Sequence, residues 1–78
     1  LRKKLAHISP WSLLVKLADR LSNVEDLEEA DEAWAESYAR QTKDILVYLK
    51  DHVDLDKPQR RLIKEIEDIT DDFFNRRK

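Results

Sequence analysis

The sequence predicts an all-α protein, an antiparallel bundle of three main helices with a short helical segment at its N-terminus. The 78 residues contain no Gly and two Pro, and Leu, Ala, Glu, Lys and Arg are abundant, a composition that favours helices. Apolar residues recur at spacings of three and four in three stretches, which indicates helices that are buried on one side. Short loops between such helices place neighbours antiparallel. The length allows one domain at most, over residues 1–78.

The first main helix is expected over residues 10–27, after an opening segment at residues 1–8. Ser9 can cap this helix, and Pro10 suits its first position, where the missing N–H is no loss. Its apolar stripe consists of Leu13, Leu14, Leu17, Leu21 and Val24. A polar stripe about 80° wide lies on the opposite side and consists of Ser12, Lys16, Asp19, Asn23 and Asp26. Such a stripe is either a functional site or the solvated side of the helix.

The second main helix is expected over residues 31–50. The stretch 25–36 holds seven acidic residues and no basic one, and we expect a solvated turn in its middle. Asp31 and Glu32 then lie at the N-terminus of the helix, where the helix dipole favours acids. The face expected to be apolar consists of Trp34, Tyr38, Thr42, Ile45 and Leu49.

The last helix is expected over residues 57–76, after a connector at residues 51–55. Asp56 and Gln59 have the spacing of a capping box at its start. Its apolar stripe consists of Leu62, Ile66, Ile69 and Phe73, with Ile63 and Phe74 beside it. The basic residues that close the chain suit the negative end of the helix dipole.

Composition excludes several functional classes. Without Cys the chain forms no disulfide, thiolate metal cage or Cys nucleophile, and without Gly it has no Gly-rich phosphate loop. The balance of 15 basic and 17 acidic residues argues against nucleic acid as a partner. The longest apolar run, residues 45–49, is too short to cross a membrane, and we expect a cytoplasmic protein. Because the chain starts with Leu1 rather than Met, we interpret it as trimmed or as part of a longer protein.

Residues 15–24 read V-K-L-A-D-R-L-S-N-V. This string resembles the K-L-A-D-R-L-x-N signature late in HD-domain metal-dependent phosphohydrolases, and is closest to the branch that hydrolyses guanosine tetraphosphate (ppGpp). Residues 38–42, Y-A-R-Q-T, look like the helix that follows the signature in that family. The resemblance covers residues 9–49, and it implies that the chain is a portion of a larger HD-type helical domain.

The resemblance also implies roles for four residues. Asp19 matches the last carboxylate ligand of a divalent metal, Mn²⁺ or Mg²⁺, which activates water for attack on a phosphoryl group. Asn23 matches a residue that contacts the substrate, a nucleotide or related phosphate ester. Lys16 and Arg20 match the flanking basic positions, Lys16 on the substrate side and Arg20 in support of the site and its carboxylates. No residue of this chain is assigned as catalytic.

The sequence departs from the family pattern at several points. Ser22 stands where the family often has His, and Asp26 where it often has Thr. The His and His-Asp ligands expected upstream are absent, since His7 is not followed by Asp and Asp51-His52 is the pair in reverse order. One carboxylate does not make a metal site. We therefore expect the isolated chain to be inactive unless another segment or chain supplies those ligands.

The alternative interpretation is a non-enzymatic helical interaction module. On this view the polar stripe of residues 12–26 is ordinary surface, and Trp11, Trp34 and Phe74 contact a partner. Trp11 and Leu27 lie off the main apolar stripe of the first helix, which favours self-association or packing against missing N-terminal helices. A nucleic-acid adaptor that uses the short basic patches at residues 60–61 and 76–78 ranks last, because the overall charge is −2.

Overall fold

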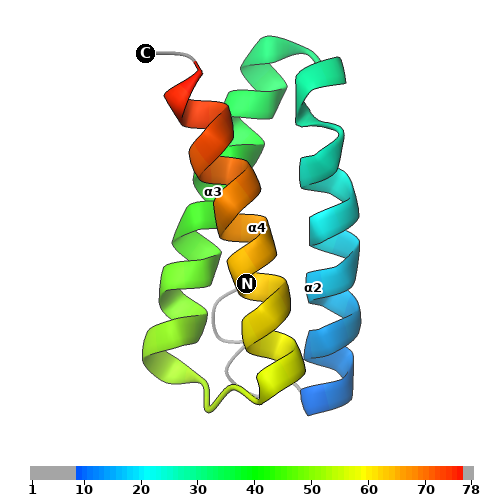
Figure 1. Cartoon of the computed structure of the whole chain (residues 1–78), viewed down its shortest axis with the longest axis vertical. Coiled ribbons are helices and arrows are strands. Elements are labelled where there is room, and N and C mark those ends of the chain that lie inside the picture. The colour runs from blue at the N-terminus through cyan, green and yellow to red at the C-terminus, as the bar shows by residue number, and fades with distance from the viewer. Residues whose placement is uncertain (1–8, 77–78) are drawn as a thin grey trace.

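The computed structural model describes residues 9–76, and within them it contains only helices and connections. The order is α2 (Pro10–Glu25), the short 3₁₀ helix η1 (Leu27–Glu29), α3 (Glu32–His52) and α4 (Lys57–Asn75). Helices α2 and α4 run in the same direction, and α3 runs opposite to both (Figure 1). The all-α class and the three-helix arrangement are confirmed. The expected helical segment at residues 1–8 lies outside the described residues.

Local signals place the helix starts as the sequence predicts. Ser9 accepts a hydrogen bond from the backbone N–H of Ser12 at 3.2 Å, and Asp31 accepts one from Trp34 at 3.2 Å. Asp56 forms the complete capping box with Gln59, with both bonds at 2.9 Å. These caps satisfy backbone donors that have no partner inside the helix.

Two helix ends differ from the prediction. Helix α2 ends at Glu25 rather than at residue 27, and the chain continues into η1, which buries Leu27 in the core. The expectation that Leu27 lies off the main apolar stripe, on surface available for self-association or for missing helices, was therefore wrong. Helix α3 continues through His52, which was assigned to the connector, because its ring stacks on Tyr48 at 4.3 Å and approaches the Tyr48 carbonyl at 3.1 Å.

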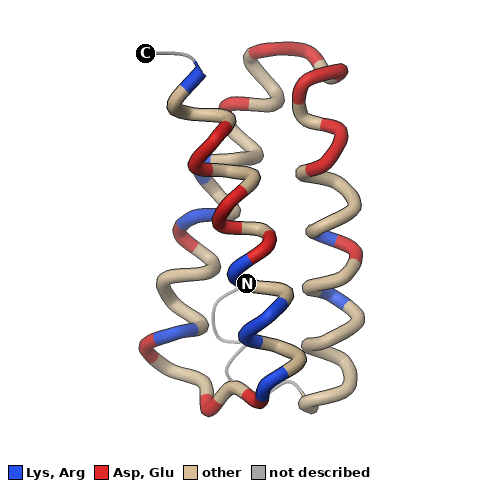
Figure 2. The backbone as a smooth tube through the Cα atoms, viewed as in Figure 1, with Lys and Arg blue, Asp and Glu red and all other residues tan. Residues whose placement is uncertain are grey.

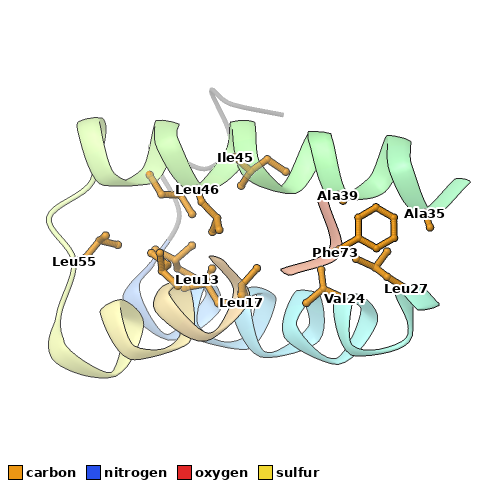
Figure 3. Close-up of a cluster of buried hydrophobic side chains, with 13 residues drawn as sticks. Leu13, Leu17, Val24, Leu27, Ala35, Ala39, Ile45, Leu46, Leu55 and Phe73 are labelled. Atoms are coloured by element: carbon orange, nitrogen blue, oxygen red, sulfur yellow. The ribbon is translucent and has the colours of Figure 1, made fainter. Parts of the chain in front are cut away.

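The core lies in the space that α2, α3 and α4 enclose, and Figure 3 shows buried side chains of α2 and α3 that point toward each other there. On α3 and α4, several of the buried residues differ from those of the expected apolar stripes. Ile63 and Thr70 are buried while Leu62 and Ile69 are half-buried, and on α3 Ala35, Ala39 and Leu46 are buried. Helix α4 contacts both α2 and α3. The residues of α4 that point between these two helices are therefore the most buried ones.

The two tryptophans, which the alternative interpretation assigns to contact with a partner, are not in the core. The exposed fraction is 72% for Trp11 and 51% for Trp34. None of the helices in the described part is long and apolar enough to span a lipid bilayer.

Candidate functional site

A groove of about 360 Å³ lies between α2 and α3, and no α4 residue lines it. Its apolar wall consists of buried residues, Leu13, Leu17, Ile45, Leu46 and Leu49. The groove also carries more exposed or polar residues, Val15, Lys16, Asp19, Arg20 and Tyr38. The structure thus places three of the four predicted site residues around one apolar depression, which we call the α2/α3 groove.

Asp19 and Lys16 lie on the solvent side of this groove. All five residues of the predicted polar stripe are exposed, as expected for one narrow helical face. Among the described residues, neither Asp19 nor Lys16 makes a hydrogen bond or an ion pair. Both charged groups are therefore accessible to a ligand or to another segment that enters the groove.

Arg20, in contrast, is bound to α3. Its Nη1 donates to the hydroxyl of Thr42 at 2.9 Å, and that hydroxyl donates to the Tyr38 carbonyl at 2.7 Å. The guanidinium also lies 4.6 Å from the centroid of the Tyr38 ring, a cation–π geometry. Arg20 thus connects α2 to α3.

Asn23 lies one turn further along α2 and meets the same tyrosine. Its Nδ2 donates to the Tyr38 hydroxyl at 3.1 Å, and the Tyr38 ring stacks on Trp34 with centroids 4.9 Å apart. Asn23 does not line the α2/α3 groove; it lines a neighbouring hollow beside Trp34. The side-chain nitrogen of Asn23 donates to Tyr38, whereas its side-chain oxygen Oδ1 accepts no hydrogen bond from another described residue.

Tyr38 is the residue that sequence reasoning undervalued. It is expected on the apolar face of the second helix, and it does pack against the core; in addition it contacts Arg20 and Asn23 and lines the groove. A signal for this role exists in the sequence. Tyr38 and Thr42 are polar residues four positions apart on an otherwise apolar face, and buried polar groups require hydrogen-bonding partners.

The described residues do not form a metal centre on their own. Nowhere in residues 9–76 do three His, Cys, Asp or Glu side chains gather closely enough to hold a metal ion. His52 is stacked on Tyr48 at the far end of α3, and His7 lies outside the described residues. Asp19 is thus a single carboxylate, which does not fit the several protein ligands that a Mn²⁺ or Mg²⁺ site requires.

No family model matches the chain, and no curated protein or solved structure matches it either.

Proposed function

We propose that this chain forms the C-terminal helices of an HD-type metal-dependent phosphohydrolase that acts in the cytoplasm on a nucleotide or a related phosphate ester. In this proposal Asp19 is one ligand of a divalent metal, and the remaining ligands come from a segment or subunit outside the 78 residues. Lys16 and Asn23 contact the substrate, and Arg20 supports the site. The isolated chain is inactive, because no group of three or more His, Cys, Asp or Glu side chains forms a metal site among the described residues.

One observation carries the proposal: the two stretches that resemble the family contact each other. Residues 15–24 and 38–42 are joined by the Arg20–Thr42 and Asn23–Tyr38 hydrogen bonds. The same contacts leave Asp19 and Lys16 accessible beside the groove, as a carboxylate ligand and a phosphate-binding ammonium require.

The α2/α3 groove also fits the proposal that the remaining metal ligands come from a segment or subunit outside the 78 residues. Its wall is apolar and its opening bears Asp19, so an apolar helix that packed there would bring its own side chains next to the carboxylate. We expect the upstream part of the domain to occupy this groove.

The test uses the longer protein that includes the upstream segment, with Mn²⁺ binding measured by calorimetry and pyrophosphate release measured with guanosine tetraphosphate as the probe substrate. Asp19→Asn is expected to weaken Mn²⁺ binding at least tenfold and to lower turnover. Asp26→Asn is the matched control, because Asp26 is an exposed aspartate seven positions further along the same polar stripe. Equal Mn²⁺ affinity in wild type and Asp19→Asn would refute the proposal.

A second function, a non-enzymatic helical interaction module, is favoured by the exposed apolar side chains. The exposed fraction is 50% for Val15 on α2 and 59% for Val47 on α3, in addition to the two exposed tryptophans. If the longer protein binds no Mn²⁺ and releases no pyrophosphate, while Val15→Lys abolishes binding between it and a purified partner, the interaction module is the better description.

A further inference from the structure

The outer surface along which α2 and α4 lie side by side contains two hollows, one near each end; we call it the α2/α4 seam. The hollow near the start of both helices has a volume of about 590 Å³ and is lined by Leu14, Ala18, Lys57, Pro58, Arg61 and Leu62. The hollow near their ends has a volume of about 260 Å³, and its charged residues are Glu25, Glu28, Asp72 and Arg76. The seam is therefore basic at one end and mainly acidic at the other.

The charges of α4 are ordered against the helix dipole. Four basic and no acidic residues lie between positions 57 and 64, and five acidic and no basic residues lie between positions 65 and 72 (Figure 2). Acids at the start and bases at the end would stabilise the helix, so the observed order is unfavourable for the isolated helix. Within the fold, α3 pairs with part of the acidic half, through Lys43 with Asp71 and Lys50 with Glu67. Neither of these pairs involves a residue that lines the two hollows of the seam.

The two ends of the seam carry opposite net charges that the fold does not neutralise. Lys57 and Arg61 are exposed and have no ion-pair partner among the described residues, which gives +2 at the first hollow. At the second hollow Arg76 pairs with Glu28 at 2.7 Å and with Asp72 at 2.9 Å. The three carboxylates and the one guanidinium give this hollow a net charge of −2. Glu25 has no ion-pair partner within residues 9–76.

Apolar surface is available at the basic end. Leu14, Ala18, Pro58 and Leu62 line the first hollow. Trp11, whose exposed fraction is 72%, lies three and seven positions before Leu14 and Ala18 and so on the same side of α2. A partner that covered this end would bury apolar area as well as pair charges.

We propose that the α2/α4 seam binds the seam of a second copy of this chain, with the two copies related by a two-fold axis and antiparallel to each other. This arrangement puts the +2 end of each copy opposite the −2 end of the other, and a two-fold contact closes as a dimer. A nucleic acid or an anionic membrane, negative throughout, would be repelled by the acidic end. The 19 residues of α4 extend over about 28 Å, and with a helix diameter of about 10–12 Å each copy contributes roughly 300 Å², which fits a weak dimer.

Sedimentation equilibrium of the 78-residue chain tests the proposal. We expect a concentration-dependent dimer that is weaker in 500 mM than in 50 mM NaCl, because salt screens exposed charges. Two double variants should each weaken the dimer at least about tenfold: Lys57→Glu/Arg61→Glu and Glu25→Lys/Asp72→Lys. In a two-fold dimer the contact between a basic end and an acidic end occurs twice, so each double variant removes the charge attraction at both places.

An equimolar mixture of these two double variants provides the sharpest readout. One variant then carries −2 at both ends of its seam and the other carries +2 at both ends, so the mixture should associate although neither variant does alone. Asp44→Lys/Asp51→Lys is the control for net charge, because both aspartates lie on the exposed side of α3 and outside the seam. It should leave the dimer unchanged, and circular dichroism confirms that each variant is folded.

Three results would overturn the proposal. The first is a chain that remains monomeric up to 1 mM in 50 mM NaCl. The second is a dimer that is insensitive to salt and to both double variants but is lost in Val15→Lys, which would assign the contact to the α2/α3 groove. The third is a mixture of folded double variants that does not associate.

Discussion

The hydroxyl of Thr42 offers the clearest test of how α2 and α3 are held together. Thr42 is completely buried, and its hydroxyl accepts from Arg20 at 2.9 Å while donating to the Tyr38 carbonyl at 2.7 Å. The substitution Thr42→Val removes that hydroxyl and keeps the shape of the side chain. It leaves the half-buried Arg20 guanidinium without its acceptor on α3.

The expected loss of unfolding free energy follows from these contacts. A hydrogen bond to a charged group contributes about 1.5–3 kcal/mol, and water replaces part of it because Arg20 is only half-buried. The Tyr38 carbonyl still accepts from the backbone of α3, so its lost side-chain bond matters little. We therefore expect Thr42→Val to lower the unfolding free energy by about 1–2 kcal/mol.

Urea unfolding followed by circular dichroism measures this loss, and Thr70→Val is the matched control. Thr70 is also completely buried, but its hydroxyl donates only to carbonyls of its own helix, those of Ile66 and Glu67, both at 3.0 Å. We expect Thr70→Val to have the smaller effect. A double-mutant cycle with Arg20→Met should give a coupling of about 1 kcal/mol. Equal losses of unfolding free energy in Thr42→Val and Thr70→Val, or a coupling energy near zero, would show that the Arg20–Thr42 hydrogen bond does not stabilise the packing of α2 against α3.

Two further predictions concern the ends of α4. Phe73→Ala should lower the unfolding free energy by about 3–5 kcal/mol, because Phe73 is only 2% exposed. Phe74→Ala should have a clearly smaller effect in the same urea titration, because Phe74 is half-buried. Similar losses in the two variants would contradict the assigned core. Asp56→Ala should lower the melting temperature, because it removes about 1 kcal/mol of capping energy from the start of α4. Asp54→Ala changes an exposed aspartate two residues earlier and should leave the melting temperature unchanged. An equal decrease in both variants would show that the loss of the cap is not the cause.

The helices and their starts could be predicted from the sequence because the signals are local. Helical propensity is set residue by residue, and the caps at Ser9, Asp31 and Asp56 act on backbone groups only three positions away. Two helix ends differ from the prediction because they depend on side-chain packing. Helix α2 ends before η1, where Leu27 is buried, and α3 continues to His52, whose ring stacks on Tyr48.

The site was predicted only as a set of residues on one polar face. Spacing placed Lys16, Asp19 and Asn23 on one exposed face of a helix, and all three are exposed in the structure. Spacing could not show that Lys16 and Asp19 line the α2/α3 groove while Asn23 lines a neighbouring hollow, because the angle around one helix does not define what lies opposite. The partners of Arg20 and Asn23, Thr42 and Tyr38, are 22 and 15 positions away, and those contacts depend on how α4 sets the relative positions of α2 and α3.

The sequence by itself determined that the chain is helical, where its helices begin and which side chains are polar. The tertiary structure alone decided that Leu27 is buried while Trp11 is exposed, that Arg20 is bound while Asp19 is accessible, and that basic and acidic ends lie along one seam. The physical reason is that backbone hydrogen bonds and caps act within a few residues. Burial and pairing depend instead on neighbours that only the packing of three helices brings near.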